Sequence, residues 1–163
     1  MPTPSNGARY EMPSPTEILL VEDDADTCEM IVKVLSAEGY GVRTAANGWE
    51  GLLAIETPPA LILLDIMLPG MDGLVFLRSL RNTHQFEHVP VIVVTALDVQ
   101  DITEKVRPFG VKEVVSKGET LFPQLKAAIK RHLAELTALS PTELVDGRYK
   151  KFRAMGAFVE AQA

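Results

Sequence analysis

Residues 61–73 read LILLDIMLPGMDG, an unbroken apolar run that ends on one carboxylate, Asp65, and passes at once into turn residues. A short apolar run closed by Pro69, Gly70 and Gly73 is typical of a strand buried on both faces, as in a parallel sheet covered by helices. Asp65 would then stand at the carboxyl end of that strand, where open parallel sheets form their ligand crevice. The alternative is that Asp65 only caps the following loop, as aspartate does in many turns.

The composition indicates one domain with a well-buried core. The 163 residues are 47% hydrophobic, and 16 basic against 22 acidic residues give a net charge of -6. An acidic chain without a Lys/Arg-rich run argues against direct binding to nucleic acid. No apolar stretch reaches the roughly 18 residues of a membrane span, and the Pro-rich start lacks the features of a signal peptide. We therefore expect a soluble, cytoplasmic protein that does not contact a membrane. The single Cys28 cannot form an internal disulfide, and its helical spacing predicts a packing role.

The pattern along the chain divides it into three segments. Residues 1–16 are rich in proline and are predicted to be a disordered leader. Residues 17–138 carry the regular apolar periodicity of one domain. Residues 139–163 begin a new segment at Ser140-Pro141 and are predicted to form a C-terminal helical tail. This tail docks on the domain or frays, or it meets an acidic partner through its basic residues.

Short apolar runs alternate with segments of helical spacing throughout residues 17–138. The predicted strands are 18–21, 42–45, the run before Asp65, 89–94 and 111–116. Helix caps are expected at Asn47, Asp72 and Asp98, and Pro108 with Gly110 should end the fourth helix. Five strands alternating with five helices predict an α/β fold: a flavodoxin-like (βα)5 three-layer sandwich whose parallel sheet has the order 2-1-3-4-5.

Polar groups follow four of these strands: Glu22 and Asp23, Asp65, Thr95, and Lys117. The predicted fold gathers them at one edge of the sheet. Carboxylates around one cleft repel each other unless a cation lies between them, and an all-oxygen set suits Mg²⁺. A hydroxyl and a lysine suit the oxygens of a phosphoryl group, and an aspartate can accept that group as a nucleophile. The alternative is a structural network of ion pairs.

Four motifs resemble the receiver domains of bacterial two-component response regulators. They are LLVEDD at 19–24, LLDIMLPGMDG at 63–73, VVTA at 93–96 and VSK at 115–117, in family order, and the likeness covers roughly residues 18–136. The resemblance implies that Asp65 is the phosphoacceptor and that Thr95 and Lys117 sense the phosphate. It also implies that Asp23 and the Met67 backbone carbonyl bind Mg²⁺ directly, and that Glu22 acts through water.

The resemblance implies a single-domain response regulator of a phosphorelay, not an enzyme. Its partners would be a sensor histidine kinase or phosphotransfer protein and a downstream protein target, because no DNA-binding helix-turn-helix follows the domain. Two alternatives stay open: a receiver-like binding module that is never phosphorylated, and a Mg²⁺-dependent aspartyl phosphatase. The latter, by resemblance to the haloacid dehalogenase class, should carry an aspartate where Met67 stands. Whether activation pairs two copies is also left open.

Two positions depart from the family pattern. Gly118 stands where the family usually has proline, and Val114 where it usually has tyrosine or phenylalanine. We therefore expect phosphorylation to be kept, while the output surface of the fourth helix, fifth strand and fifth helix works differently. Met67 and Leu97 flank the phosphoryl site by the same resemblance. Neither side chain can orient an attacking water by hydrogen bonding, which predicts a long-lived acyl phosphate.

Overall fold

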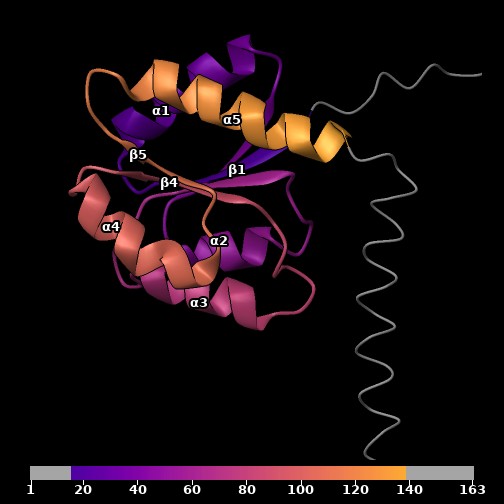
Figure 1. Cartoon of the computed structure of the whole chain (residues 1–163), viewed down its shortest axis with the longest axis vertical. Coiled ribbons are helices and arrows are strands. Elements are labelled where there is room, and N and C mark those ends of the chain that lie inside the picture. The colour runs from indigo at the N-terminus through magenta and orange to yellow at the C-terminus, as the bar shows by residue number, and fades with distance from the viewer. Residues whose placement is uncertain (1–15, 139–163) are drawn as a thin grey trace, which may run out of the picture.

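A computed structural model describes residues 16–138, with side chains up to residue 135. Five parallel strands form one sheet in the order β2-β1-β3-β4-β5, with helices on both of its faces (Figure 1). The predicted fold class and strand order are therefore confirmed. The strands are β1 (Glu17–Val21), β2 (Gly41–Ala45), β3 (Leu61–Leu64), β4 (Val91–Thr95) and β5 (Glu113–Ser116). The helices are α1 (Ala25–Ala37), α2 (Gly48–Ala54), α3 (Gly73–Asn82), α4 (Val99–Val106), the 3-10 helix η1 (Arg107–Phe109) and α5 (Leu121–Ala138).

The predicted leader and tail fall almost wholly outside the described residues, which leaves both as predictions. Within the described part, no helix combines the length and apolar character needed to cross a bilayer.

The sheet separates two apolar cores. One core lies between the sheet and helices α1 and α5, and the other lies between the sheet and helices α2, α3 and α4 (Figure 1). Successive residues of β1 alternate between these cores, because side chains of a strand point to opposite faces in turn. Every residue of β3 and β4 is buried, which explains why both strands read as uninterrupted apolar runs.

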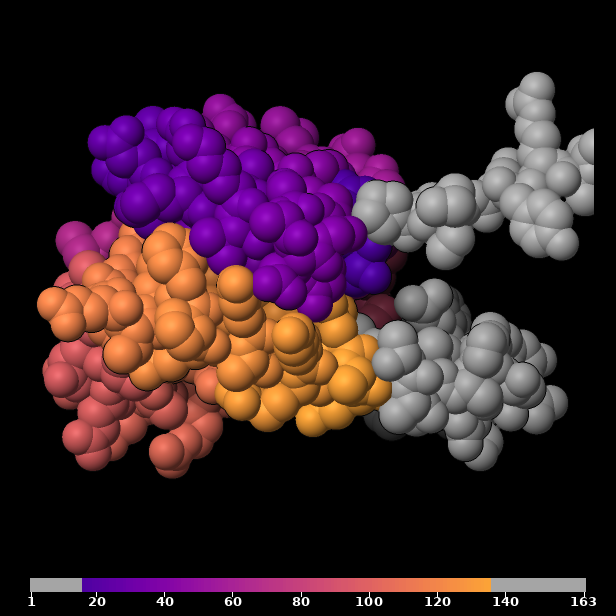
Figure 2. Space-filling model, turned by 90° about the horizontal axis from the view of Figure 1, so that it is seen from above, coloured from indigo at the N-terminus to yellow at the C-terminus, as the bar shows by residue number. Residues whose placement is uncertain are grey.

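Helices α1 and α5 lie side by side on the face that Figure 2 shows, α1 in violet and α5 in orange. Beyond their shared apolar core, an ion pair joins Lys126 of α5 to Glu38 at the end of α1, with Nζ 2.9 Å from Oε1. The pair is partly exposed, so it contributes little to stability compared with the apolar contacts beneath it.

The predicted helix caps are all formed, at Asn47, Asp72 and Asp98. Each side chain accepts a hydrogen bond from an amide of the first turn, and these amides have no partner within the helix. The fourth helix ends before Pro108 as expected. It passes into the single turn η1, which Gly110 closes in a left-handed conformation with φ of 61°.

Two strands begin later than the apolar pattern predicts. β4 begins at Val91 instead of Val89, because Pro90 has no N–H to donate and only its carbonyl accepts a bond from the neighbouring strand. β5 begins at Glu113 instead of Val111. Apolar residues just before a strand can pack on the core without joining the ladder, and Val111 does so.

Candidate functional site

Parallel pairing brings the carboxyl ends of the strands to one edge of the sheet. Val21, the last residue of β1, pairs with Leu64, the last residue of β3. At the other side of the same edge, Thr95 of β4 pairs with Ser116 of β5. The residues that follow these strands therefore leave the sheet close together, although they are far apart in sequence.

Asp65 directly follows β3 and is only 5% exposed. Its amide donates to the carbonyl of Val21 at 3.0 Å, which fixes its main chain against the end of β1. Its Oδ1 accepts a hydrogen bond from the amide of Met67 at 3.0 Å, so Asp65 does cap its own loop. Its Oδ2 lies 2.8 Å from Nζ of Lys117. One oxygen is thus held by the main chain, and the other faces a cation.

Three carboxylates and one lysine share this site. Glu22, Asp23 and Asp65 each bring an oxygen within 4.8 Å of the others. Nζ of Lys117 lies 2.6 Å from Oε2 of Glu22 and 2.8 Å from Oδ2 of Asp65, so it bridges two of the three. Glu22 is 3% exposed whereas Asp23 is exposed, so solvent reaches the cluster from the Asp23 side.

Burial and charge shift the pKa values of Glu22 and Lys117. Burial raises the pKa of the Glu22 carboxyl, although hydrogen bonds from Lys117 and from the Asp24 amide oppose that shift. Burial by itself would lower the pKa of Lys117. Its hydrogen bonds to Asp65 and Glu22, together with their charges, outweigh burial and raise the pKa of the lysine. Lys117 is therefore held as a cation.

The cluster fits the predicted Mg²⁺. All its donors are carboxylate oxygens, which suit a hard divalent ion. The one ammonium group contacts two of the three carboxylates, which leaves negative charge to be neutralised. The Met67 amide donates to Oδ1 of Asp65, and Met67 as a residue is 60% exposed. The role of the Met67 carbonyl as a ligand stays a prediction.

Thr95 is fully buried at the end of β4, and the structure does not join its hydroxyl to the ion-pair network of the described residues. Its Oγ1 accepts a hydrogen bond from the Leu97 amide at 3.0 Å. Its carbonyl accepts one from the amide of Lys117 at 2.8 Å, so the main chains of Thr95 and Lys117 are directly linked. Thr95 is therefore beside the cluster and bonded to its own loop.

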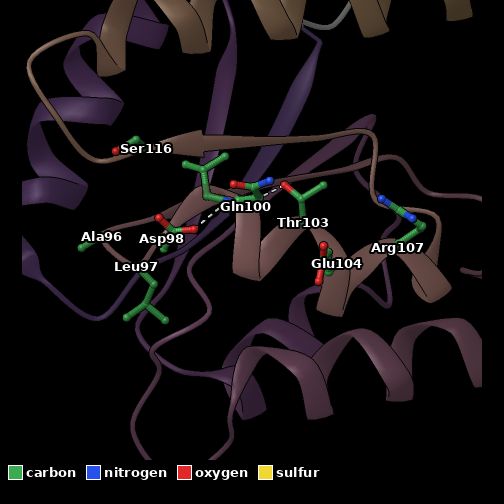
Figure 3. Close-up of a pocket in the computed structure, with 9 residues that line it drawn as sticks. Ala96, Leu97, Asp98, Gln100, Thr103, Glu104, Arg107 and Ser116 are labelled. Atoms are coloured by element: carbon green, nitrogen blue, oxygen red, sulfur yellow. Dashed lines mark hydrogen bonds between the residues drawn. The ribbon is translucent and has the colours of Figure 1, made fainter.

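An open hollow of about 830 Å³ begins where the Thr95 strand ends (Figure 3). Residues from the β4–α4 loop, helix α4 and the end of β5 line it, including Leu97, Gln100, Arg107 and Ser116. None of the three carboxylates is among its lining residues. The hollow is therefore separate from the acidic cluster and lies on the neighbouring face formed by α4 and β5.

Two residues near the site have functions that the sequence analysis missed. Asp24 is the N-cap of α1, and its Oδ1 accepts from the Thr27 amide at 2.7 Å. An aspartate just before a helical apolar pattern could have indicated this cap. Gly73 leaves no room for a side chain, because a Cβ there would lie 2.6 Å from Cα of Ile66 and 2.8 Å from the carbonyl oxygen of Asp65. Only the packed structure shows that close approach.

Comparison with known proteins agrees with this geometry. The sequence matches the family described as response regulator receiver domain over residues 18–130. The chain is 38% identical over 132 residues to the transcriptional regulatory protein HprR of Escherichia coli K12, and the match covers 80% of the chain and 57% of HprR. It is 34% identical over 122 residues to the polar-differentiation response regulator DivK of Brucella anthropi, and that match covers 74% of the chain and 98% of DivK.

Among solved structures, a CheY-like response regulator receiver domain protein from Methanospirillum hungatei is 29% identical. It superposes with a TM-score of 0.70, over 78% of this chain and 100% of that one. The chain spans a little over half the length of HprR and nearly the whole of DivK. With its fold, its acidic strand ends and these matches, the chain belongs to the response regulator receiver domain family of two-component systems.

Proposed function

We propose that this chain accepts a phosphoryl group on Asp65 from a sensor histidine kinase or phosphotransfer protein, and passes the signal on by altered contacts with a downstream protein. The observation that carries the proposal is the pairing of Oδ2 of the buried Asp65 with Nζ of Lys117, inside a cluster of two more carboxylates. Receiver domains act with histidine kinases or phosphotransfer proteins, which supports the choice of donor.

Oδ2 of Asp65 is the nucleophile in this proposal. Oδ1 is held by the Met67 amide, so the carboxylate cannot turn freely and Oδ2 stays directed into the cluster. A new bond forms between Oδ2 and phosphorus while the bond from phosphorus to the donor nitrogen breaks, and the donor imidazole leaves with the electron pair of that bond. Positioning and neutralisation of charge supply most of the catalysis in such a transfer.

Lys117 neutralises the charge that the transfer brings. It starts against Oδ2 of Asp65 and Oε2 of Glu22, so its ammonium group is already within reach of phosphoryl oxygens attached to Asp65. Asp23, Asp65 and the Met67 carbonyl would hold a Mg²⁺ ion directly and Glu22 would act through water, and the ion would supply further charge neutralisation. The Thr95 hydroxyl, whose oxygen accepts from the Leu97 amide, can donate its own proton to a phosphoryl oxygen.

The proposed output is a protein contact and not a DNA contact. The net charge of -6 disfavours a polyanionic partner. Whether phosphorylation pairs two copies is a question the sequence leaves open, and size-exclusion chromatography with and without a beryllofluoride mimic of the phosphoryl group tests it. The same mimic, used in a pull-down, compares the partners of the two states.

Intact-mass spectrometry tests the phosphoacceptor. The protein is incubated with acetyl phosphate and Mg²⁺, and the wild type should gain the mass of one phosphoryl group while Asp65→Asn should gain none. Asp72→Asn is the matched control, because it makes the same change seven residues later at an exposed helix cap, where asparagine caps as well as aspartate. It should gain the adduct.

The other outcomes support the two alternatives. No adduct in the wild type indicates a binding module that is not phosphorylated. Continuous release of phosphate with rapid turnover of acetyl phosphate, dependent on Asp65, indicates a phosphatase. An adduct that persists in Asp65→Asn contradicts the choice of acceptor.

A further inference from the structure

Met67 and Leu97 are exposed residues whose main chains bind two buried groups of the site, the Asp65 carboxylate and the Thr95 hydroxyl. The Met67 amide donates to Oδ1 of Asp65 and the Leu97 amide donates to Oγ1 of Thr95, each at 3.0 Å. Met67 and Leu97 are 60% and 39% exposed as residues. Both line one hollow of about 340 Å³ between the β3–α3 loop and α4. The two side chains therefore share one space beside the phosphoacceptor loop.

Apolar residues make up most of the lining of this hollow, on the Met67 and Leu97 side of the loop that follows Asp65. Leu97 has no polar atom, and the thioether of Met67 is only a weak acceptor. Leu74 and Ile102 also line the hollow, and its charged members are Asp72 and Lys105. Asp72 already accepts a hydrogen bond from the Leu74 amide as the cap of α3. A change that gave Met67 a strong acceptor would therefore add one hydrogen-bond partner for water to this hollow.

We propose that oxidation of Met67 to the sulfoxide by a peroxide shortens the lifetime of the phosphoryl group on Asp65, an inference that rests on the proposed function. The Met67 sulfur takes one oxygen atom from the peroxide and loses two electrons. The O–O bond breaks, and the rest of hydrogen peroxide leaves as water. Methionine sulfoxide reductases reverse the change, so the modification is a reversible signal.

Exposure makes Met67 the reactive methionine of its loop. Met71, four residues later, is only 5% exposed and packs so closely that its Sδ would lie 2.7 Å from a Cβ placed on Gly48. Met30 on α1 is 49% exposed and serves as a second accessible site on another element. Peroxide should therefore oxidise Met67 and Met30 well before Met71, because oxidation follows access to the sulfur.

The sulfoxide oxygen is a polar acceptor on the Met67 side chain, and the main-chain amide of the same residue contacts the Asp65 carboxylate. It can hold a water molecule oriented towards the phosphorus. Attack by this water forms a new O–P bond and breaks the bond between phosphorus and Oδ2, which restores the carboxylate and releases inorganic phosphate. One added hydrogen bond to the attacking water corresponds to a rate increase of about three- to tenfold.

The test uses the whole chain, before and after treatment with hydrogen peroxide that is then removed. Peptide mapping first gives the extent of oxidation at Met67, Met30 and Met71. Each sample is loaded with acetyl phosphate and Mg²⁺, and loss of the phosphoryl mass with time gives its lifetime. The variants are Met67→Leu and Met30→Leu, each compared with its own untreated sample. Both keep the other five methionines, so effects elsewhere in the chain remain in them.

We expect peroxide to shorten the lifetime about three- to tenfold in the wild type and in Met30→Leu, and to leave it unchanged in Met67→Leu. Treatment with the two methionine sulfoxide reductases, one for each sulfoxide epimer, should restore the wild-type value. Failure of the untreated wild type to gain a phosphoryl group overturns the proposed function. An adduct whose lifetime is the same before and after oxidation, or falls equally in Met67→Leu, overturns only this inference, as does resistance of Met67 to peroxide.

Discussion

Replacing Lys117 by methionine should destabilise the fold, because it removes the cation that two buried carboxylates share. The side chains of Glu22 and Asp65 are 1% and 6% exposed, and Nζ of Lys117 contacts both of them, at 2.6 and 2.8 Å. Methionine keeps the apolar stem of the side chain and is only one atom shorter, so the main loss is the charge. The variant therefore leaves three carboxylates close together without a counter-ion from the protein.

The size of the effect follows from burial. Removal of one partner from a buried ion pair costs about 3–5 kcal/mol, because it leaves an uncompensated charge away from water. Lys117 keeps 15% exposure and the cluster is open to solvent beside Asp23, so we expect the lower end, about 3 kcal/mol. For a chain of this size that corresponds to a fall in Tm of about 10 °C.

Thermal unfolding followed by circular dichroism, with EDTA present, measures this change. Lys126→Met is the matched control, because Lys126 also has a carboxylate partner, at 2.9 Å, but the side chains of this pair are 39% and 31% exposed. Solvent screens such a pair, so the control should unfold at the wild-type temperature. Mg²⁺ added in excess over the EDTA should raise the Tm of Lys117→Met more than that of the wild type, since it neutralises the negative charge that the missing lysine leaves behind.

Equal Tm values for the two lysine variants would refute the reasoning, since burial would then not decide the strength of the ion pair. If Mg²⁺ does not reduce the fall in the Tm of Lys117→Met, the expectation that the cluster binds a divalent cation is refuted.

Arg81→Met should lower stability by about 3 kcal/mol, because the guanidinium group donates at 2.7 to 2.9 Å to three carbonyls of the α3–β4 loop and η1. The exposed Arg78→Met is its control in urea unfolding, and equal midpoints would contradict the prediction. Gly73→Ala should lower the free energy of unfolding by about 1–3 kcal/mol and slow phosphorylation of Asp65, since the new Cβ meets main-chain atoms. Gly118→Ala is its control and should unfold like the wild type, because the atom nearest to its Cβ lies at 3.7 Å. Burial raises the pKa of the Cys28 thiol, so less thiolate is present at a given pH. Iodoacetamide should therefore react more slowly with the folded chain than with the urea-unfolded chain. Equal rates would show that the fold does not protect the thiol.

Sequence patterns predicted the order of elements because the signals involved are local. The run before Asp65 indicated a buried strand by length and composition, and Asn47, Asp72 and Asp98 indicated helix starts by hydrogen bonds that span only a few residues. The boundaries of β4 and β5 were wrong by two residues each, because an apolar residue beside a strand can pack on the core without pairing. Strand pairing is a tertiary property, and the apolar pattern records only burial.

The site divides in the same way. The sequence by itself determined which polar residues stand at the carboxyl ends of strands β1, β3, β4 and β5, since alternation of strands and helices leaves one common edge for them. Only the tertiary structure decided that Lys117 bridges Glu22 and Asp65, that the Thr95 hydroxyl is bonded to the Leu97 amide, and that Met67 and Leu97 share one hollow. Lys117 and Asp65 are 52 residues apart, and contacts at that separation depend on how whole elements pack and on which rotamers that packing allows.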